Sequence, residues 1–138
     1  MNNSIIALDI GDSSIGVAAS DPSGVISMPI GTIKRTSKVE DMKQLKEICD
    51  SRNVDTIVVG LPLDINGEIG AQAKKVKKYV VNIKKSIDCE IVYVDERYTS
   101  KMANNTLNTL NIKRGKQKGF EDALAASYIL EIYLKRNN

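Results

Sequence analysis

Apolar runs predict three strands in the first third of the chain. Residues Ser4–Ile10 are apolar and β-branched, as in a strand buried on both faces. Ser14–Ser20 is a second strand of small and β-branched residues, and a third runs from residue 25 to about residue 33. Residues 21–24 carry Asp first, Pro second and Gly fourth, which is typical of a type I turn. Three strands joined by short turns indicate an antiparallel meander.

The hydrophobic pattern then changes to helical spacing. Ser37 and Glu40 make a capping box, and the helix that follows has apolar positions at Val39, Met42, Leu45, Ile48 and Cys49. A second helix carries the apolar stripe Ile69, Ala73, Val76, Val80, Ile83 and Ile87, with lysines mostly on its other faces. A short apolar strand follows each helix, at residues 56–60 and 90–94.

The remaining chain predicts two helices separated by a basic loop. Thr99 or Ser100 can cap the first of these helices. Residues 113–118 are basic and contain glycine, so we expect a loop there. The final helix runs from about residue 120 to 135 and is apolar nearly all round, which predicts deep packing.

These elements predict an α/β fold with a five-stranded mixed sheet flanked by helices. The antiparallel three-strand meander comes first, and two strands reached by helical crossovers should lie parallel to the first strand. This order is compatible with the RNase H-like fold and differs from an all-parallel doubly wound sheet. No repeat or linker appears, so we expect a single domain over residues 1–138.

The absence of histidine limits the chemistry. It excludes Ser-His-Asp triads, imidazole acid–base pairs and histidine-ligated zinc, which leaves carboxylates and an oxygen-preferring metal such as Mg²⁺. Cys49 and Cys89 lie far apart, and we expect them to be buried thiols in a reducing compartment. There is no signal-peptide pattern and no apolar run near the ~20 residues of a membrane span. The sequence therefore predicts a cytoplasmic protein.

Charge is distributed unevenly along the chain. Residues 1–33 carry Asp9, Asp12 and Asp21 with no Lys or Arg, a local charge of −3. Since the whole chain has a net charge of +3, the remainder is +6. An acidic patch beside a basic body suits a metal site next to a surface that binds a polyanion, although a solvated basic surface fits equally well.

Two acidic positions at predicted strand ends are candidates for metal chemistry. Asp9 ends an otherwise apolar strand, where an unpaired charge is costly, or it only caps the turn. Gly11 and Gly16 around that turn leave room for a ligand to approach the backbone. Glu96 follows the last strand, whose end should meet the end of the first strand at one sheet edge. Alternatively, Glu96 pairs with Arg97 in a hydrated loop.

A third carboxylate begins the last helix. Asp122 lies on an otherwise apolar face, but an acid in a first turn is also favoured by the helix dipole. Glu121 competes for the same role, and periodicity does not choose between them. Three converging carboxylates are what hydrolysis with two metal ions, roughly 3.5–4 Å apart, requires.

A cluster of cations precedes that helix: Lys113, Arg114, Lys116 and Lys118. They are candidates for contacts with backbone phosphates, or for a solvated loop. No aromatic residues cluster with them, so the sequence shows no platform for stacking bases.

Four blocks in order resemble the YqgF family, also called RuvX. D-x-G-x-x-x-I-G-V-A-x-S-D is matched by residues 9–21, and G-L-P-x-x-x-N-G by residues 60–67. D-E-R-x-T is matched by residues 95–99, and D-x-x-A-A by residues 122–126. The resemblance covers nearly the whole chain. Members are associated with maturation of the 5′ end of 16S ribosomal RNA and were first proposed as Holliday junction resolvases.

The resemblance implies roles for individual residues. Asp9, Glu96 and Asp122 would be the catalytic carboxylates and the ligands of Mg²⁺ or Mn²⁺, which selects Asp122 over Glu121. Arg97 and Thr99 would support the site or contact phosphate. The family usually has a basic pair just before the Ile-Gly of the first block, where this chain has Ser13 and Ser14. Substrate binding is therefore expected to depend more on the cations at 113–118.

The resemblance implies a nuclease, most simply one acting on precursor 16S ribosomal RNA. A Holliday junction resolvase would use the same carboxylates and a symmetric dimer, and we expect a monomer or weak homodimer. A non-catalytic nucleic-acid-binding module with structural acids is an alternative of another class. An actin-like ATPase also opens with D-x-G, but the chain is short for two lobes and has no Walker-type loop.

Overall fold

Five strands form one mixed sheet in the computed structural model, which describes residues 4–96 and 114–136, with only the backbone at 114–120. The strands are β1 (Ser4–Ile10), β2 (Ser14–Ser20), β3 (Ser27–Lys34), β4 (Val54–Leu61) and β5 (Glu90–Asp95). Their order is β3-β2-β1-β4-β5, with β1, β2 and β3 antiparallel and β4 and β5 parallel to β1. The predicted meander and its two parallel additions are confirmed.

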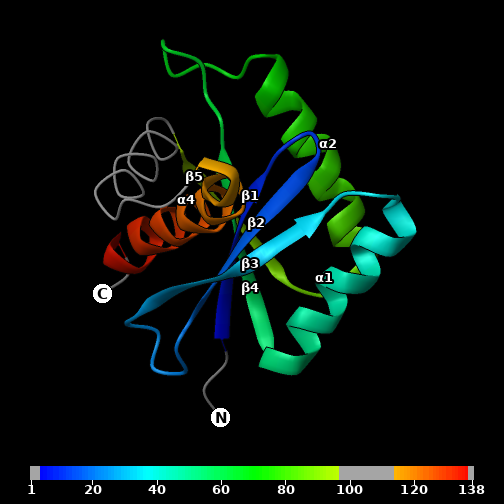
Figure 1. Cartoon of the computed structure of the whole chain (residues 1–138), viewed down its shortest axis with the longest axis vertical. Helices are drawn as coiled ribbons and strands as arrows, with labels where there is room; N and C mark the ends of the chain where they lie inside the picture. The colour runs from blue at the N-terminus through cyan, green and yellow to red at the C-terminus, as the bar shows by residue number, and fades with distance from the viewer. Residues whose placement is uncertain (1–3, 97–113, 137–138) are drawn as a thin grey trace.

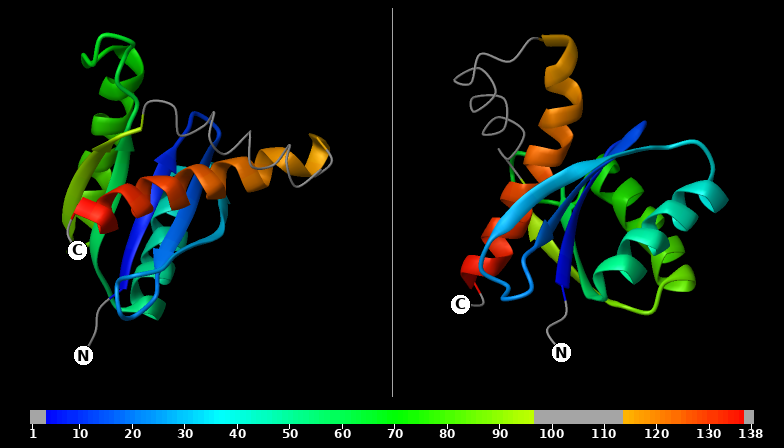
Figure 2. Two further views of the ribbon diagram at one scale, coloured as in Figure 1. Left: turned by 90° about the vertical axis from the view of Figure 1, so that its left-hand side faces the viewer. Right: turned by 60° about the horizontal axis from the view of Figure 1, so that its bottom comes forward.

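The described helices cover the two faces of this sheet. Helices α1 (Lys38–Arg52) and α2 (Ala71–Ser86) lie on one side, and α4 (Arg114–Arg136) crosses the other (Figures 1 and 2). Ser37 caps α1 by accepting a hydrogen bond from the Glu40 N–H at 3.1 Å, as the capping box predicts. No helix in the described ranges is both long and apolar enough to cross a membrane.

The central strand β1 separates two hydrophobic cores. Its residues Ile6, Leu8 and Ile10 pack toward α1 and α2, whereas Ala7 packs toward α4 with Ile5 at its margin. Because side chains alternate along a strand, Asp9 follows Ile5 and Ala7 onto the α4 face. The fold therefore places this carboxylate under the last helix.

Asp21 explains why β3 begins later than the sequence predicts. The Gly24 N–H donates to the Asp21 carbonyl at 2.9 Å, which confirms the turn. The Asp21 carboxylate also accepts the backbone N–H groups of Val25 and Ile26, at 2.9 and 2.8 Å. Those two residues therefore belong to the turn, and β3 starts at Ser27.

The prediction of a basic loop at residues 113–118 is wrong for most of that segment. Helix α4 already begins at Arg114, so Arg114, Lys116 and Lys118 are helical. Lys, Arg and Gln are good helix formers, and each Gly costs only about 1 kcal/mol relative to Ala. Two glycines therefore do not stop a helix whose later turns are buried. Lys113 and the helix predicted from Thr99 or Ser100 lie outside the described residues.

Candidate active site

Asp9 lies between two glycines on neighbouring strands. In the antiparallel register Asp9 is opposite Gly16 of β2. On the other side Leu8 pairs with Val59 of β4, so Gly60 is the next position along the strand. Directly opposite residues share a face of the sheet. The α4 face around Asp9 is therefore cleared of β2 and β4 side chains.

Glu96 fills the space above Gly60. A Cβ atom at Gly60 would lie 2.6 Å from Oε2 of Glu96 and would overlap the end of the Ile129 side chain. The Glu96 N–H donates to the Leu61 carbonyl at 3.2 Å, which holds the end of β5 against the end of β4. The side chains of Glu96 and Asp9 are hydrogen-bonded to each other. The predicted meeting of these two acids at one sheet edge is thus what the fold produces.

Burial and mutual repulsion keep a proton on this pair. Burial raises the pKa of Glu96 strongly, and the negative charges of Asp9 and Asp95 raise it further. Burial also raises the pKa of Asp9, with additional repulsion from Asp122 and Glu121, while the hydrogen bond from Glu96 opposes that shift. Protonated Glu96 donates to ionised Asp9, so without a cation the pair carries about one negative charge.

The missing side chain at Gly16 lets helix α4 approach the sheet closely, which brings Asp122 near Asp9 and Glu96. A Cβ atom at Gly16 would overlap the backbone carbonyl of Asp122 and lie 3.1 Å from the Ala123 nitrogen. The expected room for a ligand at Gly16 is therefore occupied by the start of the buried part of α4. Ser14 fixes the Asp122 side chain, because its hydroxyl donates to Oδ2 at 2.6 Å.

The arrangement has the chemistry of a divalent-cation site. Within the described part of the chain, no three acidic or cysteine side chains are already gathered tightly enough to hold a metal ion. Asp9 and Glu96 touch, however, and Asp122 is close enough to raise the pKa of Asp9. A dication would replace the shared proton and relieve this repulsion. The donor set, all oxygen, suits Mg²⁺ or Mn²⁺.

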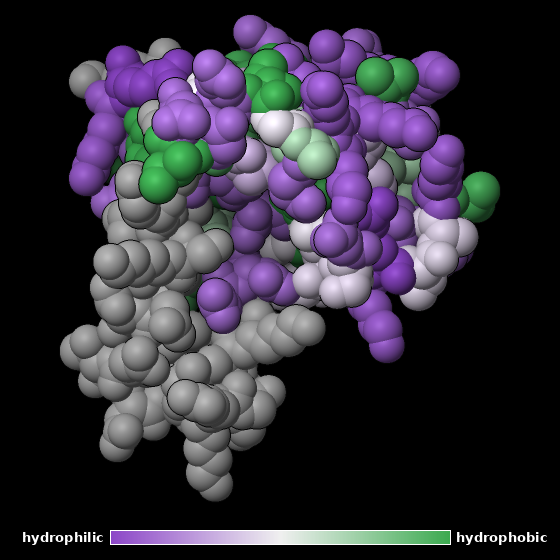
Figure 3. All heavy atoms as spheres, turned by 90° about the horizontal axis from the view of Figure 1, so that it is seen from above, coloured by the Kyte–Doolittle hydropathy of each residue, from purple (hydrophilic) through white to green (hydrophobic). Residues whose placement is uncertain are grey.

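The surface at this end of the molecule is polar. Seen from the edge at which β1, β4 and β5 end, hydrophilic residues cover most of the coloured surface (Figure 3). The predicted contacts Arg97, Thr99 and Lys113 lie outside the described residues, while Arg114, Lys116 and Lys118 occupy the first turns of α4. The structure brings Asp9, Glu96 and Asp122 to one region, and these cations precede Asp122 on its own helix.

Two contributions to the site escaped the sequence analysis. Ser14 was noted only as a departure from a family pattern, and its bond to Asp122 spans 108 positions, so no local signal reveals it. Gly60 was noted only as the start of a motif block. Its position inside an apolar strand is a signal for a close approach.

The comparisons with known proteins identify relatives over almost the entire chain. The RuvX family model, described as Holliday junction resolvase, matches residues 3–136. A protein of Clostridium acetobutylicum is 45% identical over 130 residues, covering 94% of this chain and 96% of the relative. One of Clostridium kluyveri is 44% identical over 132 residues, with 96% of each covered. Both carry the provisional name pre-16S rRNA nuclease.

Solved structures share the fold at low sequence identity. T. thermophilus RuvC in complex with Holliday junction substrate matches with a TM-score of 0.61 and 12% identity, covering 99% of this chain and 96% of that chain. Fowlpox virus resolvase in complex with Holliday junction DNA matches with a TM-score of 0.59 and 10% identity, covering 97% of this chain and 98% of that chain. These likenesses confirm the predicted RNase H-like fold.

The two glycines beside Asp9 should be intolerant of a methyl group. Gly16→Ala should destabilise the protein by about 1–3 kcal/mol, because α4 backbone must move. Gly60→Ala should have a smaller effect on stability, since Ile129 can rotate, but it should displace Glu96. Gly70→Ala is the matched control, because nothing lies within 4 Å of its Cβ. Thermal melting would check this order of stabilities among the three variants. A Gly16→Ala protein as stable as Gly70→Ala would contradict the close packing of α4 against Gly16.

The shared proton predicts how stability depends on pH in chelator. The folded-state pKa of Glu96 is raised above its ordinary value of 4.5, so its contribution is fully present below that value and is lost as pH rises through the folded pKa. Glu96→Gln cannot lose this proton. Its melting temperature relative to wild type should therefore increase between pH 5 and pH 9. Glu47→Gln, an exposed site, should show no such trend. Parallel curves for all three proteins would refute the shared proton.

Proposed function

Because the chain belongs to the RuvX family, described as Holliday junction resolvase, we propose that it is a metal-dependent nuclease acting on structured nucleic acid. The observation that carries this proposal is the partly buried contact between Asp9 and Glu96 with Asp122 beside it. Crowded carboxylates cost stability in the absence of a cation, and a purely structural role gives no reason for them. Metal-dependent hydrolysis of a phosphodiester bond does give a reason for crowded carboxylates.

The proposed substrate is the 5′ region of precursor 16S ribosomal RNA. It is supported by relatives at 44–45% identity whose provisional name is pre-16S rRNA nuclease. Branched DNA is the second candidate, favoured by the family description and by the junction complexes of the structural neighbours. A resolvase cuts two strands, so this alternative requires two copies of the chain on one junction.

We propose that Asp9, Glu96 and Asp122 hold Mg²⁺ or Mn²⁺, in a two-ion arrangement. The ions would supply an activated water and charge stabilisation of the leaving oxygen. Asp9 and Glu96 bind from the ends of β1 and β5, and Asp122 from α4, so three separate elements fix the geometry. Glu96 must release its proton first, which makes metal binding weaker at low pH.

Cations before Asp122 are proposed to contact the substrate backbone. Lys118 precedes Asp122 by one helical turn, about 6 Å along the axis, and Arg114 by two turns. Lys116 lies between them, and Lys113 adjoins the helix. In this proposal a nucleic-acid strand that is cleaved near Asp122 runs along the first turns of α4. Arg97 and Thr99 follow Glu96 by one and three positions in sequence and are proposed to contact phosphate near the scissile bond.

Charge-neutralising variants test the site most directly. Asp9→Asn, Glu96→Gln and Asp122→Asn should each reduce cleavage of precursor 16S RNA at least ~100-fold, with combined effects far from additive, because one lost ligand disables the unit. Nucleic-acid binding should survive, since less negative charge faces the phosphates. Activity should require Mg²⁺ or Mn²⁺ and stop in EDTA. The assay is single-turnover cleavage, beside binding measured in EDTA.

The outcomes of this assay separate the candidate functions. Preference for a four-way DNA junction over the RNA would select the resolvase. Tight binding with no metal-dependent cleavage of either substrate would select the non-catalytic binding module. Full activity in EDTA, or in two of the three variants, would refute the carboxylate mechanism.

Ser14 should tune the metal requirement through Asp122. Its hydrogen bond to an ionised carboxylate is worth roughly 1.5–3 kcal/mol, and it fixes the side chain before metal binds. Ser14→Ala should therefore raise the Mg²⁺ concentration for half-maximal cleavage about tenfold. Ser14→Thr keeps the hydroxyl and should have the wild-type Mg²⁺ requirement. A lower Mg²⁺ requirement in Ser14→Ala would instead mean that Ser14 competes with the ion for Asp122.

A further inference from the structure

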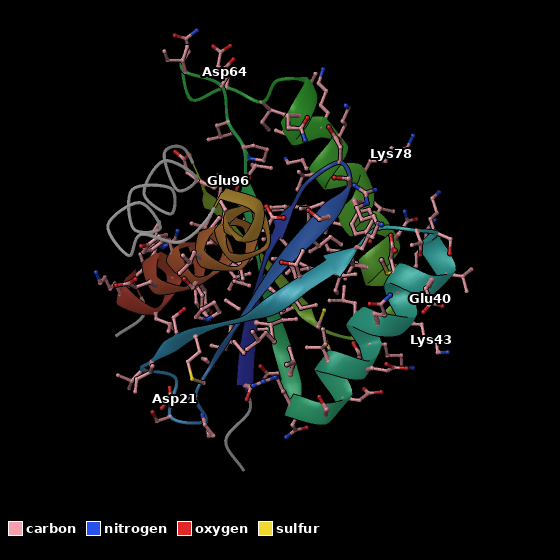
Figure 4. The ribbon with its side chains drawn as sticks, in the orientation of Figure 1. Asp21, Glu40, Lys43, Asp64, Lys78 and Glu96 are labelled. Atoms are coloured by element: carbon pink, nitrogen blue, oxygen red, sulfur yellow. The ribbon has the colours of Figure 1, made fainter. Side chains whose placement is uncertain are left out.

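A basic groove lies on the opposite face of the sheet from the carboxylates. Four cations line a depression of about 330 Å³ between the β1–β2 turn, the start of α1 and α2, together with Asn82 and Asp12. We call it the basic groove, and its cations are Arg35, Lys38, Lys75 and Lys78. Figure 4 shows Lys78 on the α2 side and Glu96 on the α4 side of the sheet.

Buried contacts of Asp41 hold two residues that line the basic groove, Arg35 and Tyr79. Asp41 is 3% exposed and accepts hydrogen bonds from the Tyr79 hydroxyl at 3.2 Å and the Thr36 N–H at 3.0 Å. Arg35 pairs with Asp41 at 3.9 Å, and its guanidinium lies 4.5 Å from the centre of the Tyr79 ring. These contacts fix the position of the Arg35 cation in the lining of the depression.

The lysines at its rim are largely uncompensated. Lys75 lies 3.7 Å from Asp12, but both side chains are well exposed, and such a pair is weak. Among the residues that the structure describes, no ion pair involves Lys38 or Lys78. The Asn82 amide adds a neutral hydrogen-bond donor. A depression with excess positive charge and an amide suits a phosphate group.

The β1–β2 turn connects the groove to the carboxylates. Arg35 donates to the Gly11 carbonyl at 2.6 Å, and Asp12 lines the groove. Asp9 precedes this turn, and Ser14, which holds Asp122, follows it. The groove and the carboxylates are therefore separated by a turn of three residues, 11–13. A nucleic-acid strand crossing this turn can reach both faces.

We propose that the basic groove binds a backbone phosphate of the same nucleic-acid strand that is cleaved at the carboxylates. This proposal rests on the proposed nuclease function and adds a second contact point for its substrate. The turn itself carries Gly11, Asp12 and Ser13 and no cation. Lys38, Lys75 and Lys78 supply cations from the far side of that turn.

Binding measured in EDTA, without cleavage, tests this groove. The variant K38A/K75A/K78A removes three charges from its rim, and K43A/K46A/K84A removes three exposed lysines elsewhere on α1 and α2. Affinity for a precursor RNA hairpin and a four-way DNA junction is measured by anisotropy over a range of KCl. The groove variant should lose about one unit of log–log salt slope on duplex substrates, as one lost phosphate contact predicts, and the control less than half a unit.

Lysine footprinting on the wild-type protein gives a second, independent measurement. Bound nucleic acid should protect Lys38, Lys75 and Lys78 from acetylation more than Lys43, Lys46 and Lys84. Equal slopes in the two variants, or equal protection of the two sets, would overturn the proposal. So would protection of the groove by inorganic phosphate but not by nucleic acid, which would indicate a site for small anions.

The outcomes distinguish a failure of the groove proposal from a failure of the proposed nuclease function. If the wild-type protein cleaves and both triple variants bind equally well, the groove proposal fails and the nuclease function stands. If the wild-type protein binds neither nucleic acid, the proposed function fails, and the groove proposal fails with it. Matching melting temperatures of the two triple variants would show that the comparison is between folded proteins.

Discussion

Two carboxyl groups share a small volume at the carboxyl ends of β1 and β5. Asp9 and Glu96 are partly buried, and this burial together with neighbouring negative charges raises the pKa of both groups and favours a proton shared between them. The surrounding sequence accommodates this crowding. Gly60 makes space for Glu96, Gly16 lets α4 approach, and Ser14 satisfies an oxygen of Asp122. Each of these small residues has little purpose unless the carboxylates must meet.

Most of the fold follows from local sequence signals. The apolar runs of β1 and β2, the capping box at Ser37 and the stripe of α2 each specify an element without tertiary information. The beginning of α4 was mistaken because glycine and dense charge favour a loop locally, while the buried later turns extend the helix. Tertiary packing decided that boundary, and a single sequence does not display tertiary packing.

The site was predictable to a lesser degree. Asp9 stands out because it ends an apolar strand, but Asp122 and Glu121 were equivalent by periodicity, and only the resemblance to a family chose between them. In the structure Ser14 donates a hydrogen bond to Asp122, while the charges of both Asp122 and Glu121 raise the pKa of Asp9. The basic groove was hidden in an ordinary pattern of exposed lysines. Its character depends on Asp41 and Tyr79, which are 38 residues apart in sequence.

The late position of α4 in the chain governs when one face of the sheet can be covered during synthesis. Its partners β1, β2 and β3 are made first, yet Ser14 waits for a residue 108 positions downstream. Until α4 has left the ribosome, the face of the sheet carrying Ala7, Ala18 and Val58 remains uncovered, and the third carboxylate is missing. A nascent chain therefore lacks one of the three proposed metal-binding carboxylates until its last helix has been made.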